Sequence, residues 1–253
     1  MPSQSGIYYF QSNGKSREKP AVILIHGAAG NHLNWPHTIR RLGEHRVFAL
    51  DLPAHGKSNG IGEQSIEGYC RILDRWMTGV GISQAVVIGH SMGGAIALMM
   101  ALEYPDQVLG LGLVSTGAKM PVNQGMLDML QGESTFPKAI ELIVKWSYAQ
   151  ELDPKTKRQV MKQMLENRPG AVYGDFLACS QFDVRERLGE IEMPAVVITG
   201  SEDKMMAVSS SEYLHENMSD SRLHIIEGGG HMVMLEKPDE AGKLVSQFLK
   251  EFD

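Results

Sequence analysis

Cysteine is scarce in this chain of 253 residues, which contains only Cys70 and Cys179. The two cysteines lie far apart and form none of the short spacings that bind structural metals, so we expect no metal site. Two free thiols are the expected state, as in proteins of a reducing compartment. Residues 1–6 have neither the charged nor the apolar region of a signal peptide. The sequence therefore predicts a cytoplasmic protein.

Long hydrophobic runs and clusters of positive charge are also missing. The longest apolar run, residues 95–102, is too short to cross a bilayer. The chain has 24 Lys and Arg against 30 Asp and Glu, which gives a net charge of −6. An acidic chain without a basic run is poorly suited to bind nucleic acid or an anionic membrane. These absences favour a small molecule as the partner.

What the sequence does contain is an alternation of apolar segments with helical patterns, which predicts an α/β fold with a mostly parallel sheet flanked by helices. After Ser65, apolar residues recur every three or four positions, as on one face of a helix. Another helix is expected over residues 33–42, and Ser209 with Glu212 resembles a capping box that opens a third. Apolar runs typical of buried strands occur at 7–10, 21–25, 46–50, 85–88, 109–114, 195–199 and 221–226.

The alternation breaks between residues 117 and 183, where helical patterns punctuated by prolines replace the strands. These patterns cover residues 126–130, 136–148, 155–166 and 173–182. We therefore expect a core in two parts, residues 1–116 and 184–253. The helical insertion, residues 117–183, is expected to lie over the carboxyl ends of the strands.

Residues 89–93, Gly89-His90-Ser91-Met92-Gly93, carry the strongest functional signal. They form a G-x-S-x-G motif between a predicted strand and a predicted helix, which is the setting that this motif requires. The turn is so tight that a Cβ at either glycine would clash. It lifts the Ser91 hydroxyl above the sheet and points the N-terminus of the next helix at whatever Ser91 attacks. Ser91 is the predicted nucleophile.

Ser91 needs a base, because a serine hydroxyl reacts at neutral pH only when a neighbouring group takes its proton. Histidine is the usual base, and in G-x-S-x-G proteins it follows the serine and the acid in the chain. That order leaves His215, His224 and His231. His215 falls within a predicted helix and His224 within a predicted strand. His231 follows the last strand after a run of glycines, so we predict His231 as the base.

The third member of such a triad is a carboxylate on a loop after a strand, where it can orient the imidazole. Asp203 meets this condition, because it follows the strand expected at residues 195–199. Its neighbour Glu202 is the alternative. Asp51 precedes Ser91 in the chain and is expected to hold its own loop by hydrogen bonds.

The negative oxygen that forms during acyl transfer needs preorganised hydrogen-bond donors. One expected donor is the backbone N–H of Met92, directly after the nucleophile. The other is expected in the loop of small residues after the strand at 21–25, where the N–H of Ala28 is best placed. His26, at the start of this loop, is expected to brace the loop rather than to react.

Five motifs thus follow one another: His26-Gly27-Ala28, residues 51–58, residues 89–94, residues 200–203, and Gly230-His231 with Glu236 and Pro238. Their order and spacing resemble those of the α/β-hydrolase superfamily over essentially the whole chain. The resemblance implies an eight-stranded, mostly parallel sheet with a cap domain at residues 117–183. The chain departs from the family pattern at Ala54, where relatives often have glycine. It also lacks the proline that commonly follows the acid.

Within this superfamily, Ser91 excludes the chemistry of the members with an aspartate nucleophile, the haloalkane dehalogenases and epoxide hydrolases. The chain resembles small bacterial carboxylesterases, and also the carbon–carbon bond hydrolases of aromatic ring-cleavage products. The latter often have asparagine before the serine and tryptophan after the histidine, where this chain has His90 and Met232. We therefore expect a serine carboxylesterase that needs no cofactor and cleaves small or medium acyl esters through an acyl-enzyme. A carbon–carbon bond hydrolase, a perhydrolase and a hydrolase-fold receptor with slow turnover are the alternatives.

Two side chains are candidates for contact with the substrate. Trp146 belongs to the predicted insertion, where it faces either the pocket or the insertion's own core. Met232 follows the predicted base directly, and further methionines, Met92, Met205, Met206 and Met234, also lie beside the site in sequence. Methionine fills irregular space, and plain core filling is the main expectation for this group.

Overall fold

The computed structural model describes residues 3–16 and 18–252. Within them, one sheet of eight strands has the order β1-β2-β4-β3-β5-β6-β7-β8. The pairs β1–β2 and β2–β4 are antiparallel and the other pairs are parallel, which confirms the predicted fold. The strands are β1 (Ser3–Gln4), β2 (Ile7–Ser12), β3 (Ala21–Ile25), β4 (Val47–Leu50), β5 (Ala85–His90), β6 (Val108–Val114), β7 (Ala195–Gly200) and β8 (Ser221–Ile226).

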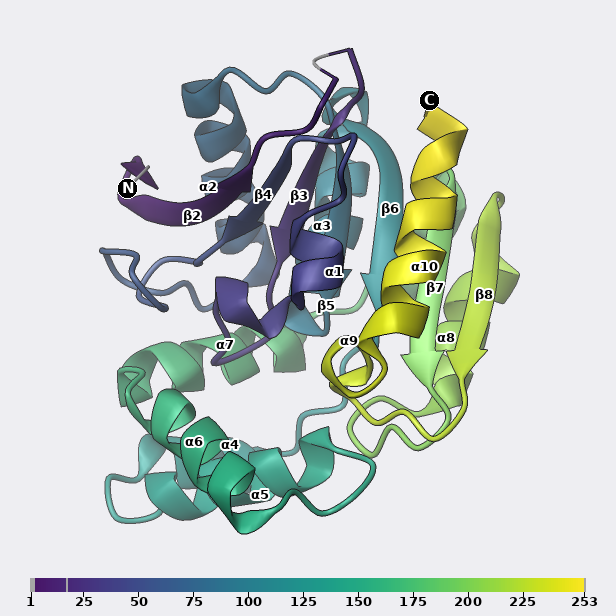
Figure 1. Ribbon diagram of the computed structural model, residues 1–253. Helices are drawn as coiled ribbons and strands as arrows, with labels where there is room; N and C mark the ends of the chain where they lie inside the picture. The colour runs from purple at the N-terminus through teal and green to yellow at the C-terminus, as the bar shows by residue number, and fades with distance from the viewer. Residues whose placement is uncertain (1–2, 17, 253) are drawn as a thin grey trace.

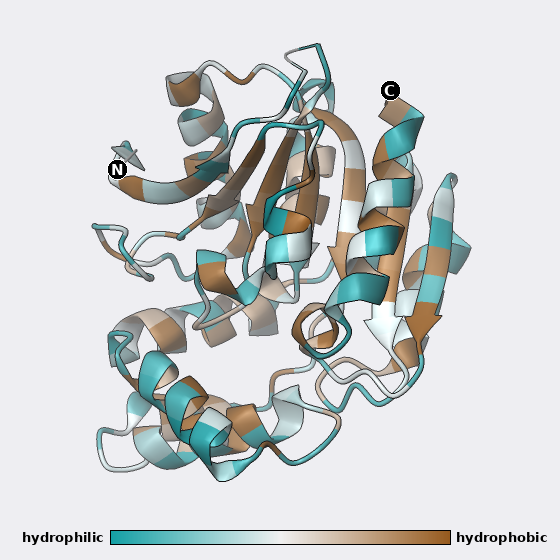
Figure 2. Cartoon of the chain, viewed as in Figure 1, coloured by the Kyte–Doolittle hydropathy of each residue, from teal (hydrophilic) through white to brown (hydrophobic). Residues whose placement is uncertain are grey.

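The sheet is covered by helices on both faces (Figure 1). Every residue of β3, β4 and β5 is buried, as uninterrupted apolar runs require, and Figure 2 shows these strands as hydrophobic. One face packs against α2, α3 and α8, and the other against α1 and α10. These helices are α1 (His37–Arg40), α2 (Ile66–Val80), α3 (Met92–Glu103), α8 (Val208–Asn217) and α10 (Pro238–Leu249).

Four further helices separate β6 from β7 along the chain and lie beyond the carboxyl ends of the strands (Figure 1). They are α4 (Gln124–Gln131), α5 (Phe136–Ser147), α6 (Pro154–Leu165) and α7 (Pro169–Gln181). The chain leaves the core and returns to it at neighbouring points, because Lys119 and Asp183 form a β-bridge. The division into units 1–116, 117–183 and 184–253 stays a prediction, and residues 1, 2, 17 and 253 lie outside the described residues.

Two local predictions are wrong. The helix expected over residues 33–42 is interrupted at Pro36, because proline has no N–H and disfavours a helical residue before it. The capping box of Ser209 and Glu212 does not form, since α8 begins at Val208, two residues earlier than this box requires, with Ala207 as its uncapped N-cap. The remaining short helices are α9 (Val233–Glu236) and the 3-10 turns His32–Asn34, Pro105–Gln107, Arg185–Glu190 and Lys250–Phe252.

Three further findings concern the described part of the chain. None of its helices has the length and apolar character needed to cross a membrane. Cys70 and Cys179 are both buried free thiols. The described residues contain no group of three or more His, Cys, Asp and Glu side chains that could hold a metal ion.

Candidate active site

Ser91 stands at the tip of the turn between β5 and α3, where the local backbone holds it. Its φ of 51° and ψ of −118° fall in a region that residues with a side chain rarely adopt. Its N–H donates to the carbonyl of Val114 on β6 at 2.9 Å. A Cβ on Gly89 would overlap the carbonyl of Gly93, and a Cβ on Gly93 would overlap that of Ile25. Neither glycine position therefore admits a side chain.

The loops after β7 and β8 bring Asp203 and His231 together. The Nδ1–H of His231 donates to Oδ2 of Asp203 at 2.9 Å, and the carboxyl side chain is 0% exposed. Its Oδ1 accepts the backbone N–H groups of Met205 and Met206, each at 2.8 Å. Burial alone would raise the pKa of Asp203, but the facing imidazole and these hydrogen bonds lower it. Asp203 is thus a buried carboxylate at neutral pH, whereas Glu202 is exposed to solvent.

His231 and Ser91 line the same cavity. No hydrogen bond within the described residues joins the Ser91 hydroxyl to the imidazole, and such contacts are often long before substrate binds. His90 packs against His231, with ring centroids 4.9 Å apart, and its Nε2–H donates to the carbonyl of His231 at 2.9 Å. Burial, with the neighbouring imidazole, lowers the pKa of His90 to about 3. His90 is therefore a neutral support for the base, while His215 and His224 lie on α8 and β8 as expected.

The two N–H groups predicted to form an oxyanion hole are free to donate hydrogen bonds to a ligand. Those of Ala28 and Met92 donate to no acceptor within residues 3–16 and 18–252. Met92 opens α3, where helix N–H groups have no partner within the helix. The loop of Ala28 lies against the nucleophile, because a Cβ on Gly27 would be 3.1 Å from that of Ser91. His26 braces this loop, since its Nδ1–H donates to the Gly27 carbonyl at 2.7 Å.

Hydrogen bonds from distant parts of the chain hold the loop that carries His231. The carboxylate of Glu236 accepts the N–H of Gly230 at 3.0 Å and the N–H of Ala149, just beyond α5, at 2.9 Å. Lys204, on the loop after β7, donates to the carbonyl of the same Ala149 at 2.7 Å. The end of α5 is therefore bonded to the loops of both the acid and the base.

Comparison with known proteins agrees with this geometry. The family described as alpha/beta hydrolase fold matches residues 20–162. The chain belongs to the α/β-hydrolase family. Among solved structures, a thermophilic esterase is 31% identical with a TM-score of 0.82, covering 98% of this chain and 95% of that chain. An enol-lactonase from Burkholderia xenovorans LB400 has a TM-score of 0.89 at 20% identity, covering 98% of each chain, and so shares the fold.

Relatives of known activity are also similar over most of their length. A 2-hydroxy-6-oxo-6-phenylhexa-2,4-dienoate hydrolase of Comamonas testosteroni is 29% identical, covering 92% of this chain and 89% of the relative. The monoacylglycerol lipase abhd6-A of Xenopus laevis is 24% identical, covering 96% of this chain and 79% of the lipase. The present chain is thus an α/β-hydrolase whose relatives cleave different kinds of bond.

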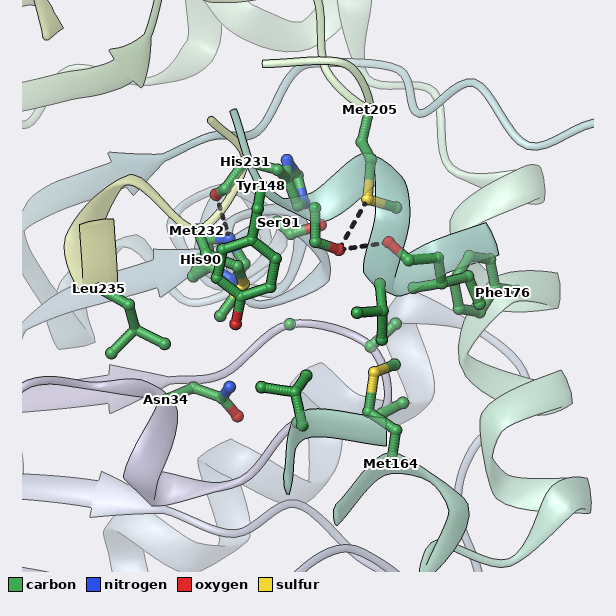
Figure 3. Close-up of a pocket in the computed structure, with 18 of the residues that line it drawn as sticks. Asn34, His90, Ser91, Tyr148, Met164, Phe176, Met205, His231, Met232 and Leu235 are labelled. Atoms are coloured by element: carbon green, nitrogen blue, oxygen red, sulfur yellow. Dashed lines mark hydrogen bonds between the residues drawn. The ribbon is translucent and has the colours of Figure 1, made fainter. Parts of the chain in front are cut away.

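A cavity of about 390 Å³ opens onto Ser91 and His231 of this α/β-hydrolase. Figure 3 shows Phe176 and Met164, which come from the inserted helices, around the same space as Met205 from the core. Most of the lining side chains are apolar. Among the described residues, no Lys or Arg contributes to the wall of this cavity.

The two predicted substrate contacts, Met232 and Trp146, lie in different places. Met232 lines the cavity together with Met205, so these methionines do more than fill the core. Trp146 lies outside the cavity and packs half-buried in the core that the inserted helices share. Helix geometry explains this, because Ile143, Val144 and Ser147 line the cavity from one face of α5. At 3.6 residues per turn, Trp146 lies about 100° around the helix from the middle of that face and so projects from a neighbouring face. For Trp146 the structure supports the alternative of packing.

Asp175 is a functional candidate that sequence reasoning missed. It is fully buried on α7 and accepts the N–H of Ala29, the residue after Ala28, at 2.9 Å. One signal was available, since Asp175 is the only charged residue between Arg168 and Asp183. A lone carboxylate in an apolar helix is expected to be buried with partners, because an unpaired buried charge is costly.

Proposed function

We propose that this α/β-hydrolase is a serine carboxylesterase that acts on neutral esters with small or medium acyl groups. The observation that carries the proposal is the buried Asp203–His231 pair, whose imidazole shares an apolar cavity with Ser91. A buried carboxylate bonded to Nδ1 of the imidazole leaves Nε2 to act as the base. The free N–H groups of Ala28 and Met92 supply donors for an oxyanion.

The reaction follows from these positions in two halves. His231 takes the proton of Ser91 as the serine oxygen attacks the ester carbonyl carbon, and the N–H groups of Ala28 and Met92 stabilise the resulting oxyanion. The carbon–oxygen bond of the ester then breaks, His231 gives its proton to the leaving alcohol, and the acyl group stays on Ser91. Water, deprotonated by His231, then attacks the carbonyl carbon of the acyl-enzyme. The bond from this carbon to the Ser91 oxygen breaks, His231 returns its proton to Ser91, and the acid is released. Asp203 stabilises the imidazolium in both halves.

The wall of the cavity supports a neutral substrate. A dienoate, such as the one in the name of the Comamonas testosteroni relative, carries a carboxylate. In this cavity that carboxylate would meet no Lys or Arg among the described residues, and a buried charge without a partner is strongly disfavoured. A neutral ester avoids this cost. The volume of about 390 Å³ lies toward the lower end of the usual range for ligand pockets, which favours small or medium acyl groups.

A substrate panel tests the proposal. p-Nitrophenyl esters from acetate to laurate and a ring-cleavage dienoate are compared by kcat/KM, with Ser91→Ala as the control. We expect steady turnover of the shorter esters, little activity on the dienoate, and a loss of several orders of magnitude in Ser91→Ala without loss of fold. A preference for the dienoate would contradict the proposal, as would a Ser91→Ala protein that keeps most of its esterase activity. A burst that stalls after one turnover would instead indicate a receptor.

A further inference from the structure

Asp175 gathers three hydrogen bonds at the contact between α7 and the core. Its Oδ2 accepts the backbone N–H of Ala29 at 2.9 Å and the Nε2–H of His55 at 2.8 Å. Its Oδ1 accepts the hydroxyl of Tyr69 at 2.6 Å. Asp175 itself is 0% exposed. One carboxylate from the inserted segment therefore joins α2, the loop after β4 and the loop after β3.

The charge of this carboxylate is balanced inside the protein. The Nε2 of His55 faces Asp175, and its Nδ1 lies 2.9 Å from the carbonyl of Pro53. Both partners are acceptors, so both ring nitrogens of His55 carry protons and the ring is an imidazolium. Burial alone would lower the pKa of His55, but the Asp175 carboxylate outweighs it and raises the pKa. Asp175 and His55 therefore form a buried ion pair.

The backbone of Ala29 is held from both sides by the inserted segment. Asp175 accepts its N–H, and the side-chain amide of Asn167 donates to its carbonyl at 3.0 Å. Ala29 has a φ of 56°, in the left-handed region that side chains disfavour. Such a conformation persists only where the surroundings impose it. These contacts come from residues 146 and 138 positions away in the chain.

The conformation of Ala29 is linked to the direction of the Ala28 N–H through the turn of residues 27–30. The Ala28 N–H lies in the same peptide unit as the Gly27 carbonyl, and this carbonyl accepts the N–H of Gly30, the residue after Ala29, at 3.1 Å. The four residues therefore move as one short turn, which lies against Ser91. We propose that Asp175 and Asn167 are positioning residues that clamp Ala29 and so aim the Ala28 N–H into the oxyanion hole. The inference rests on the proposed function, because acyl transfer is what requires this donor.

The fall in kcat expected from a loss of positioning cannot exceed the contribution of the Ala28 N–H itself. Removal of one oxyanion donor costs about 10²–10³ in kcat, so a donor that is only misaimed costs at most this much. The loss falls on kcat rather than on KM, because the donor acts on charge that develops in the transition state.

Three variants of the buried cluster separate positioning from stability. Asp175→Ala removes the acceptor of the Ala29 N–H, and we expect kcat to fall about 100-fold with KM changed by less than about threefold. Asp175→Asn keeps an oxygen that can face Ala29, so its kcat should stay within about tenfold of the wild type although it unfolds at a lower temperature. Tyr69→Phe is the matched control, because it removes a hydrogen bond to Oδ1 of Asp175 and leaves the acceptor of the Ala29 N–H in place. It should lower the melting temperature and leave kcat unchanged.

A second measurement reads the oxyanion hole directly. A trifluoromethyl ketone adds reversibly to an active-site serine, and its oxygen occupies the position of the oxyanion. Its affinity for Asp175→Ala should fall by the same factor as kcat/KM, and its affinity for Tyr69→Phe should not change. The proposal is overturned if Asp175→Ala keeps its kcat, or if Tyr69→Phe loses as much kcat and inhibitor affinity as Asp175→Ala.

A variant on the other side of the clamp keeps the proposal testable if Asp175→Ala does not fold. Asn167 is only partly buried, and Asn167→Ala should lower kcat and the affinity for the trifluoromethyl ketone together, by about tenfold. An unchanged kcat in a folded Asn167→Ala protein also overturns it. Failure of the proposed function looks different, since the wild type itself would then hydrolyse no ester. In that case the effect of Asp175 and Asn167 on the oxyanion hole would still be measured, by comparing the rates at which a fluorophosphonate labels Ser91 in the variants and in the wild type.

Discussion

Ser91 is held within the core, by its own turn and by the carbonyl of Val114 on β6, whereas the loops of Asp203 and His231 are bonded to the end of an inserted helix. On the nucleophile side, β5, α3 and the glycines at 89 and 93 set the turn. On the acid–base side, Glu236 and Lys204 bond the loops to the end of α5. The oxyanion loop resembles the second case, because its support comes from Asp175 on α7 and from Asn167, which lies two residues before that helix begins.

From this difference we expect the inserted helices to contribute to catalysis as well as to substrate choice. The nucleophile turn is a property of the core, and a change there removes the reaction. The other two parts of the site are completed by residues between β6 and β7. Substitutions of those residues are expected to lower kcat by a smaller factor, because they displace His231 or the N–H of Ala28 without removing either group.

The largest expected effect tests the acid. Asp203→Asn should keep the fold but favour the wrong imidazole tautomer, so kcat for a p-nitrophenyl ester should fall by roughly 10⁴-fold. Glu202→Gln, on the adjacent exposed residue, should change kcat by less than about threefold, as surface substitutions usually do. Reversed effects of the two variants would show that Glu202 is the acid.

A smaller loss is expected when the base loop is released from α5. The Gln side chain of Glu236→Gln has one accepting oxygen where Glu has two, so the N–H of either Gly230 or Ala149 would face an NH2 group, which cannot accept. The free energy of unfolding should fall by about 1–3 kcal/mol and kcat by about tenfold. Urea unfolding and ester hydrolysis measure the two, with the exposed Glu240→Gln as the control. If Glu236→Gln matches that control in both, the base loop does not depend on α5.

Substrate choice should depend on which face of α5 is altered. Ile143 lines the cavity, so Ile143→Ala should shift the ratio of kcat/KM between long and short esters by about 1–3 kcal/mol. Trp146 lies outside the cavity, so Trp146→Ala should lower the melting temperature and affect all esters alike. A selective effect of Trp146→Ala, with a uniform effect of Ile143→Ala, would invert the assignment of the two faces.

The smallest effect expected is on the pH dependence of stability. The Asp175 carboxylate raises the folded-state pKa of His55 above its unfolded value of about 6.5. The ion pair therefore contributes fully below that unfolded pKa, and its contribution is lost as the pH rises through the folded-state pKa. Urea unfolding between about pH 6 and about pH 9 should show this decline in the wild type and in His215→Gln, whose site is exposed. A His55→Gln protein should be less stable, and its stability should not decline over this pH range. If the stability of His55→Gln falls as steeply with pH as that of the wild type, His55 is not the source of the decline.

The parts of the molecule that could be predicted from sequence are those that local patterns determine. The β3 strand occupies the predicted residues 21–25, because a short run that is apolar at every position is typical of a strand buried on both faces of a parallel sheet. Asp203 and His231 could be chosen because chain order and loop position leave few candidates. The pairing of Asp175 with Ala29 could not be predicted, because nothing near either residue shows that α7 packs on the loop after β3. The face of Trp146 was equally undetermined, since it depends on which side of α5 meets the cavity.

In the proposed mechanism, Ser91 attacks the substrate with His231 as its base. Labelling with a fluorophosphonate, followed by digestion and mass spectrometry of the peptides, tests it most directly. We expect one phosphonyl group on Ser91, formed in step with the loss of esterase activity, and no adduct in Ser91→Ala. Labelling of His231→Ala should be slowed by at least about 10³-fold. Full inactivation with the adduct on another residue would contradict the account, as would an enzyme that is labelled on Ser91 and still hydrolyses esters.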